Sequence, residues 1–335
     1  MIEMNTELQK LQKYIKKGQK ILLINHIRMD WDALGSLGAF YLLFKKLWKE
    51  VRATNDCPIP ESFWFLWINT IIEPELSVKD YKPDCIIAFD SGSESQMGET
   101  YQKYKEIFQN TIFAQFDHHV SNDSYADINI TDTKSSSTCE LVFESLAKLW
   151  LSEYIDSQIA TLLLMWILTD TNIFYNTNTT SKTFEVATEL HKLWADQRLI
   201  IQQLFRKKWF QKSKLWGLAL WEMKQFENWN IIWSSITQEM FDITNTSYLE
   251  CAGFLNEFLA NIEWAEIAYL LYELDDWSIK WSLRSNNVDI NVSQIAAHFW
   301  GWGHARAAGL IIHWDIRKAE TQLLWVIKQY IEKAD

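Results

Sequence analysis

The sequence predicts an α/β protein in which a mostly parallel sheet is flanked by helices and is followed by a smaller α+β domain. Short apolar runs alternate with helix-like stretches through the first 194 residues, and this alternation is typical of a parallel sheet with helices on both faces. Acidic and histidine residues recur where these strands end. After residue 215, strand-like and helix-like stretches mix, which indicates a second fold.

Two domains suit a chain of 335 residues. We expect the first domain over residues 1–194, a charged linker over 195–214 and the second domain over 215–335. In the first domain we expect strands at 21–24, 50–54, 85–89 and 112–116, and helices at 1–18, 34–46, 137–149, 153–168 and 181–194. In the second domain we expect strands at 231–236, 267–274 and 278–284, and helices at 248–259, 292–299 and 316–333.

Composition excludes several classes of protein. A net charge of -11 argues against broad electrostatic binding to long nucleic acid. The four cysteines are scattered without a CxxC pair, so neither a zinc ribbon nor a disulfide framework is indicated. There is no N-terminal signal pattern and no apolar run of membrane-spanning length. These features predict a soluble, cytoplasmic protein with no membrane partner.

The stretch KILLINHIRMDWDALGS, residues 20–36, carries the first cluster of reactive side chains. A buried strand over 21–24 is followed by His26, Asp30 and Asp32, and ligands bind at the carboxyl ends of strands in open α/β sheets. Imidazole and carboxylate together suit Mn²⁺, Fe²⁺ or Zn²⁺, and two aspartates at i and i+2 diverge enough to serve two ions. The alternative is a polar loop in which Asp30 or Asp32 only caps the next helix.

Three later segments favour the metal site over the cap. Strand 85–89 ends in Asp90, strand 112–116 ends in Asp117, His118 and His119, and Asp170 follows the helix at 153–168. Six such groups at one sheet edge fit a two-metal site in which a carboxylate bridges the ions. The candidate ligands are His26, Asp30, Asp32, Asp90, His118 and Asp170.

Here the chain resembles the DHH phosphoesterase superfamily. HIRMDWDALGS is similar to the first motif of that family, HxxPDGDAxGS, with Trp31 at a glycine position and Met29 in place of the usual proline. Phe89-Asp90-Ser91 with Gly98 resembles the second motif, and residues 116–119, FDHH, carry the Asp-His-His for which the family is named.

The resemblance extends over nearly the whole chain. Residues 136–140, SSTCE, are similar to the SST-E segment, and residues 166–174, WILTDTNIF, are similar to GIxTDTGxF. In the latter, Trp166 again stands at a glycine position, and Asn172 replaces the last glycine as a residue that tolerates left-handed backbone. SLRS at 282–285 and FWGWGHARAAG at 299–309 are similar to the signatures of the DHH-associated C-terminal domain.

The resemblance implies a role for each matching ligand. His26 and Asp30 would hold the first Mn²⁺, Asp90 would bridge the two ions, and Asp32, His118 and Asp170 would hold the second. Mg²⁺ and Co²⁺ are alternative ions.

The resemblance also implies the residues that meet the substrate. His119 would contact the scissile phosphate or aid proton transfer, with Asp117 orienting its histidine neighbours. Arg284, Ser285, Gly301, Gly303 and His304 would bind the terminal phosphate and nucleotide of the substrate. Glycine allows backbone N–H groups to approach a phosphate closely, and the planar guanidinium of arginine suits the same anion.

With one DHH domain and one associated domain, the chain resembles the nanoRNase group, whose members are sometimes bifunctional as 3'-phosphoadenosine 5'-phosphate (pAp) phosphatases. This implies manganese-dependent hydrolysis of short oligoribonucleotides to mononucleotides, with short RNA or small nucleotide phosphates as partners and long duplexes excluded; a homodimer is left open. The alternatives are a cyclic- or linear-dinucleotide phosphodiesterase and a non-catalytic nucleotide-binding relative. A RecJ-type exonuclease and a manganese pyrophosphatase are disfavoured, since each carries a different additional domain.

The balance of tryptophan and glycine is unusual. There are 19 Trp and 10 Gly, whereas about 7% glycine would give roughly 23 in a chain of this length. Trp277 follows Asp275-Asp276, where Asp-Gly would be the usual hairpin turn, and Trp31, Trp166, Trp300 and Trp302 fall at glycine positions of the motifs above. The hypothesis is that the source organism reads a UGA codon as glycine; a tryptophan-rich core is the alternative.

Overall fold

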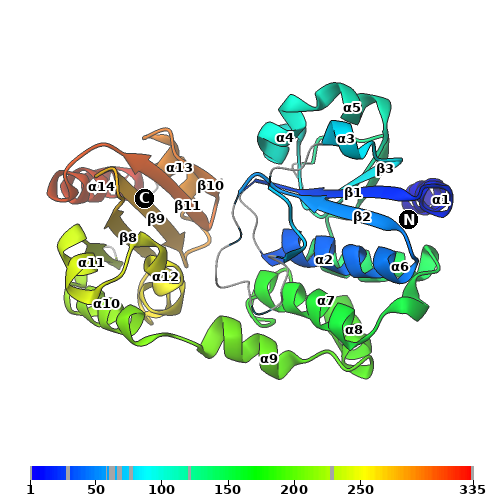
Figure 1. Cartoon of the computed structure of the whole chain (residues 1–335). Coiled ribbons are helices and arrows are strands. Elements are labelled where there is room, and N and C mark those ends of the chain that lie inside the picture. The colour runs from blue at the N-terminus through cyan, green and yellow to red at the C-terminus, as the bar shows by residue number, and fades with distance from the viewer. Residues whose placement is uncertain are drawn as a thin grey trace. The chain divides into compact units, whose positions relative to one another are not determined.

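Two compact units make up the fold, Met1–Lys207 and Lys208–Asp335, each with its own sheet and core (Figure 1). The structure is a computed structural model that describes residues 2–27, 31–57, 59, 65, 70–74, 78–119, 122–226 and 230–332. The boundary between the units lies inside the stretch 195–214, which we expected to be a linker and which contains α9 (Gln197–Ile201), a π-helical turn (Gln202–Arg206) and the start of α10 (Phe210–Trp221).

The first unit is built on a five-stranded, entirely parallel sheet in the order β2-β1-β3-β4-β5. Its strands are β1 (Lys20–Asn25), β2 (Glu50–Thr54), β3 (Cys85–Phe89), β4 (Ile112–Asp117) and β5 (Ile128–Thr131). Its helices, besides α9, are α1 (Ile2–Lys17), α2 (Trp31–Lys46), α3 (Val78–Tyr81), α4 (Gly98–Lys103), α5 (Lys105–Asn110), α6 (Thr138–Lys148), α7 (Ser157–Asp170) and α8 (Ser181–Lys192).

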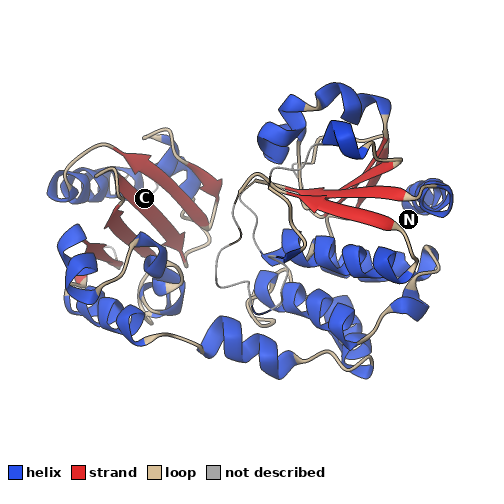
Figure 2. Ribbon diagram, in the orientation of Figure 1, coloured by secondary structure: helices blue, strands red, loops and turns tan. Residues whose placement is uncertain are grey.

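Helices cover both faces of this sheet because its strands are apolar on both sides (Figure 2). Along β1, Ile21 and Leu23 pack into the core formed with α1, α2, α6 and α7. Leu22 and Ile24 point the other way, into the smaller core formed with α3, α4 and α5. This alternation follows from the two-residue period of a strand.

Helix α7 is the central helix of the larger core, and its residues 159–168 are all buried. Asp156 caps its first turn by accepting hydrogen bonds from the backbone N–H groups of Gln158 and Ile159. Gly35 of α2 faces Trp166 so closely that a Cβ atom there would lie 1.0 Å from the indole Nε1. The two helices therefore approach each other at a residue without a side chain. Within the described part of the chain, no helix combines the length and the apolarity needed to cross a membrane.

The second unit carries a six-stranded sheet in the order β10-β11-β9-β8-β7-β6, antiparallel except for the parallel pair β7 and β8. Its strands are β6 (Lys224–Phe226), β7 (Ile231–Ile236), β8 (Ile267–Glu273), β9 (Ile279–Ser285), β10 (Trp302–His304) and β11 (Ala307–Ile312). Besides α10, its helices are α11 (Gln238–Thr244), α12 (Phe254–Glu257), α13 (Val292–Ala297) and α14 (Ile316–Ile331). Helices α13 and α14 cover one face of the sheet, and α10, α11 and α12 cover the other.

The expected fold class, a parallel sheet with helices followed by a mixed C-terminal domain, is confirmed. Three expectations about single elements were wrong. Helix α2 begins at Trp31 rather than residue 34, so Asp32 lies in its first turn and not on a loop. The continuous helix expected at 248–259 is broken into short 3₁₀ and α-helical turns, with Gly253 in left-handed backbone at the break. Strands β5, β6, β10 and β11 were not anticipated, because short strands are recognisable mainly by their partners.

Candidate metal centre

Five of the six candidate ligands gather at the carboxyl ends of β1, β3 and β4, where the amino-terminal ends of α2 and α6 also lie. His26 directly follows β1, Asp90 follows β3, and His118 follows β4. Asp32 lies in the first turn of α2, and Asp170 is the last residue of α7. Parallel strands end at one edge of the sheet, so ligands separated by long stretches of sequence meet there.

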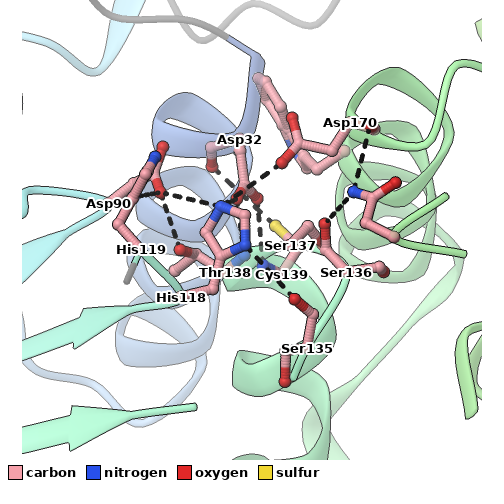
Figure 3. A network of polar contacts seen from close by, with 12 residues as sticks. Asp32, Asp90, His118, His119, Ser135, Ser136, Ser137, Thr138, Cys139 and Asp170 are labelled. Atoms are coloured by element: carbon pink, nitrogen blue, oxygen red, sulfur yellow. Dashed lines mark hydrogen bonds and ion pairs between the residues drawn. The ribbon is translucent and has the colours of Figure 1, made fainter. Parts of the chain in front are cut away.

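His118 stands at the centre of this group (Figure 3). Its Nε2 atom lies 3.7 Å from a carboxylate oxygen of Asp32, 3.8 Å from one of Asp90 and 3.5 Å from one of Asp170. Asp32 and Asp90 are almost completely buried, 1% and 2% exposed. Negative charges converge here around a single nitrogen.

The other ring nitrogen of His118 fixes its tautomer. Nδ1 lies 3.3 Å from the carbonyl oxygen of Ser135. A carbonyl can only accept, so in the neutral ring Nδ1 carries the proton and Nε2 is the nitrogen that can bind a metal. Such a backbone partner on the far nitrogen is the usual arrangement for a histidine that binds a metal.

The second predicted ligand group is described only in part. The Nε2 atom of His26 lies 3.7 Å from Oδ2 of Asp90, so these two side chains are brought together. Asp90 thus faces His26 through one oxygen and His118 through the other. Asp30, the remaining member of the predicted set, lies outside the described residues.

Helix α6 holds two of the carboxylates with its first turn (Figure 3). The backbone N–H groups of Thr138 and Cys139 donate to the two oxygens of Asp32 at 2.6 and 3.0 Å. The hydroxyl of Thr138 donates to Oδ1 of Asp90 at 2.8 Å. Ser137 caps the helix by accepting from the N–H of Glu140. The first backbone N–H groups of a helix have no partner within the helix, so these side chains satisfy them and are in turn held in place.

His119 and Asp117 form a hydrogen-bonded pair beside the cluster. Nδ1 of His119 lies 2.7 Å from Oδ1 of the fully buried Asp117. This hydrogen bond raises the pKa of His119 to about 9, against the opposing effect of burial and with help from the charge of Asp90. Burial tends to raise the pKa of Asp117, but hydrogen bonds from His119 and Asn122 outweigh it and hold that pKa below its ordinary value.

Two asparagine side chains hold the backbone at Asp170 by hydrogen bonds to carbonyl oxygens. Nδ2 of Asn178 donates to the carbonyl oxygen of Ser136 at 2.9 Å and to that of Asp170 at 3.4 Å. Nδ2 of Asn176 also donates to the carbonyl of Asp170. The chain then turns through left-handed backbone, and Asn172 has a φ of 48°, in line with its place at a glycine position of the motif.

The donor set fits a metal site. Among the described residues there are two groups of three side chains whose donor atoms lie within 4.8 Å of one another inside each group. One group is Asp32, His118 and Asp170, and the other is Asp90, His118 and His119. Carboxylate and imidazole suit Mn²⁺, Fe²⁺ or Zn²⁺. Buried carboxylates that share one imidazole repel each other, and bound cations offset that repulsion.

The residues predicted to bind substrate lie in the second unit, on and around β9 and β10. The Arg284 guanidinium donates to Oδ1 of Asn256 and to the carbonyl of Leu283, both at 2.8 Å, and its burial lowers its pKa. Ser285 is buried and donates to the carbonyl of Asn287, whereas His304 is exposed on β10.

Two glycines near these residues are required by their neighbours. A Cβ on Gly301 would lie 2.7 Å from the carbonyl oxygen of Gly309, and one on Gly303 would lie 2.4 Å from Cα of Ala308. Close approach of β11 therefore already explains glycine at both positions, in addition to the expected approach of a phosphate.

Sequence reasoning gave no role to four residues that complete the centre. Ser135, Thr138, Asn178 and the backbone of Cys139 each contact a candidate ligand or its backbone. The SST-E resemblance singled out residues 136–140 but did not indicate which side chains they contact. Only the placement of α6 beside α2 and β3 identifies its partners.

Known proteins resemble the chain in both sequence and fold. The model of the DHH family, N-terminal domain, matches residues 20–167. The probable bifunctional oligoribonuclease and PAP phosphatase NrnA of Streptococcus mutans is 26% identical and covers 92% of this chain and 93% of its own. The corresponding protein of Mycoplasma genitalium is 28% identical, covering 89% and 90%.

A solved structure shares the fold. The crystal structure of an exopolyphosphatase-related protein from Bacteroides fragilis superposes with a TM-score of 0.86 over 98% of this chain and 96% of its own, at 22% identity. Residues 20–167 therefore form a DHH-family N-terminal domain, and the chain is distantly related to NrnA proteins over most of its length.

Proposed function

We propose that the protein is a manganese-dependent phosphodiesterase that hydrolyses short oligoribonucleotides to mononucleotides and also converts pAp to AMP. The observation that carries this proposal is the convergence of Asp32, Asp90 and Asp170 on Nε2 of His118. The names of the relatives in Streptococcus mutans and Mycoplasma genitalium, oligoribonuclease and PAP phosphatase, support the choice of substrate.

The candidate ligands divide between two ions. His26, Asp30 and Asp90 would hold the first, and Asp32, His118, Asp170 and the shared Asp90 would hold the second. When bound, two divalent ions stabilise charge on phosphoryl oxygens and lower the pKa of an attacking water. The hydrogen bonds from the first turn of α6 hold Asp32 and Asp90 in the orientation that this task needs.

His119 is proposed to meet the scissile phosphate. Its side chain is 42% exposed, the most open imidazole of the cluster formed by His26, His118 and His119. The hydrogen bond to Asp117 raises its pKa, which favours a protonated ring that can donate an N–H to an anionic substrate. Asp117 fixes the ring by holding Nδ1.

Binding of the nucleotide is assigned to the second domain, which we propose spans residues 215–335 and is joined by residues 195–214 to the catalytic domain at 1–194. Arg284 would bind a terminal phosphate through the planar edge of its guanidinium. Ser285, His304 and the backbone of Gly301 and Gly303 would hold the rest of the end nucleotide. A net charge of -11 agrees with a small substrate held at one end rather than with a long polymer.

A substrate panel with Mn²⁺ tests the proposal. Labelled oligoribonucleotides from dinucleotides to long oligomers, pAp and cyclic di-AMP are each incubated with the purified protein. We expect mononucleotides from the shortest oligomers and AMP from pAp. Cleavage confined to the cyclic or a linear dinucleotide would replace the proposal with a dinucleotide phosphodiesterase, and binding without cleavage would indicate a non-catalytic relative.

A pair of histidine variants separates the site from general damage to the fold. His118→Ala removes the central ligand and should abolish cleavage. His191→Ala is the matched control, because His191 contacts the carbonyl of Ala187 and the side chain of Gln197 instead of a candidate ligand. Equal activity of the two variants would contradict the assigned site.

A further inference from the structure

Five tryptophans adopt backbone that side chains disfavour. In the part of the chain that the structure describes, 13 residues other than glycine have a positive φ, and five of them are tryptophan. They are Trp48 (57°), Trp150 (61°), Trp194 (63°), Trp277 (63°) and Trp300 (56°). Left-handed backbone brings Cβ close to the following carbonyl oxygen, so apart from glycine it is mainly asparagine and aspartate that adopt it.

Four of these tryptophans end a helix in the same way. Trp48, Trp150, Trp194 and Trp300 follow α2, α6, α8 and α13. In each case the next residue donates its N–H to the carbonyl five positions back, from Lys49 to Phe44, Leu151 to Leu146, Ala195 to Leu190 and Gly301 to Ala296. This is the Schellman motif, in which the left-handed position is usually glycine.

Helix α11 shows what the chain uses elsewhere for the same purpose. There the N–H of Thr246 returns to the carbonyl of Phe241, and the left-handed residue between them is Asn245, with a φ of 51°. Asparagine is the common substitute for glycine at this position. The Schellman motif therefore also occurs in this fold with a residue that suits left-handed backbone. At the other four helix ends the unusual feature is the tryptophan, not the motif.

Trp277 occupies the corresponding position of a hairpin. Between β8 and β9 its N–H donates to the carbonyl of Leu274, and the N–H of Leu274 donates to the carbonyl of Ser278. This pattern is a tight turn closed by a left-handed residue that forms a bulge. Glycine is the expected residue at that position.

Packing does not compensate for the strained backbone. The five side chains are exposed by 93%, 62%, 83%, 70% and 93% in chain order. Indoles this exposed gain little hydrophobic stabilisation. What the five positions share is a backbone role that glycine fulfils and tryptophan does not.

We propose that residues 48, 150, 194, 277 and 300 are glycine in the native protein, because its source organism reads the UGA codon as glycine. The composition agrees, with 19 Trp against 10 Gly. Positions 31, 166 and 302, where the sequence motifs call for glycine, do not have left-handed backbone and are not among the five. The segment before His304 would then carry glycine at position 300, as its motif calls for.

Peptide sequencing of the protein purified from its source organism tests the proposal. We expect glycine at all five positions and UGA at the corresponding codons of the gene. Trp216 and Trp233 are internal controls: both are buried, both donate Nε1 to an acceptor, and both should be read as tryptophan from UGG. Tryptophan in the native peptides at the five positions, or UGG in their codons, would overturn the proposal.

An independent observation concerns Thr138, which touches both buried carboxylates of the centre. Its N–H donates to Asp32 and its hydroxyl to Asp90, and the residue is 0% exposed. We infer that Thr138 is a positioning residue that orients the Asp90 carboxylate for ion binding. This inference rests on the proposed function.

Calorimetric titration with Mn²⁺ tests the role of the Thr138 hydroxyl. Thr138→Val keeps the N–H and the shape but removes the hydroxyl, and should weaken Mn²⁺ binding roughly ten- to a hundredfold. Thr138→Ser should restore it, and Thr244→Val, at a buried threonine of α11, should bind as the wild type does. Unchanged affinity in Thr138→Val would overturn the inference, whereas a wild type that binds no Mn²⁺ would overturn the proposed function itself.

Discussion

Replacing the five left-handed tryptophans by glycine should stabilise protein produced with tryptophan at these positions. Left-handed backbone costs a residue with a side chain about 1–2 kcal/mol, and glycine gives back roughly 0.5–1 kcal/mol through its larger entropy of ordering. The indoles are mostly exposed, so little burial is lost. The net gain is about 0.5–1 kcal/mol per position.

The gain differs between positions because of one contact. Nζ of Lys16 lies 3.6 Å from the ring centroid of Trp150, and losing an exposed cation–π contact costs about 0.5–1 kcal/mol. Trp150→Gly is therefore close to neutral. The remaining pairs, Trp48 with Trp194 in the first unit and Trp277 with Trp300 in the second, should each stabilise their unit by about 1–2 kcal/mol.

Urea unfolding followed by far-ultraviolet circular dichroism measures this effect, with each variant fitted to its own folded and unfolded baselines. The matched control is Trp325→Gly, which makes the same change at a 54% exposed position inside α14. It should destabilise by about 1 kcal/mol, because glycine is a poor residue within a helix. A Trp277→Gly/Trp300→Gly variant as destabilised as Trp325→Gly would refute the reasoning.

Three further predictions concern charged groups. In metal-free protein, a proton NMR titration of His119 should have its midpoint near pH 9, and Asp117→Asn should move it toward the ordinary value. Because the pKa of His119 is raised in the folded protein, its protonation stabilises the fold fully below about pH 6.5, and this stabilisation is lost as the pH rises through about 9. The unfolding midpoints of the wild type and of Asp117→Asn should therefore converge at alkaline pH. Asp84 accepts from the backbone N–H groups of Lys20 and Gln19, which lowers its pKa. Asp84→Ala should lower the free energy of unfolding by about 1 kcal/mol at neutral pH, given the exposure of Asp84. This difference should vanish as the pH falls through the lowered pKa, and an equal loss at neutral pH and below that pKa would contradict the prediction. Arg284→Lys should raise KM roughly tenfold and leave kcat unchanged, since a point charge replaces the planar fork; an unchanged KM in steady-state assays would argue against a phosphate contact.

The strands that organise the first unit were readable in the sequence because each is a continuous apolar run that stops at a polar residue. The runs at β1, β3 and β4 are followed by His26, Asp90 and His118, and the structure brings these side chains together. A parallel sheet requires that outcome, since its strands all end at the same edge. Spacing along the chain therefore already indicated the donor set.

Other features depended on contacts between distant segments. That Asp32 and Asp90 are held by Thr138 follows from the place of α6, more than 45 residues further along the chain from either aspartate. The same holds for the carbonyl of Ser135, which determines the tautomer of His118. The sequence already pointed to Trp277 and Trp300, whereas φ angles and helix-end hydrogen bonds were needed to find that Trp48, Trp150 and Trp194 stand in glycine positions. Local sequence determines which residues can bind or turn, whereas the partners and the backbone angle of each residue are determined by packing between elements.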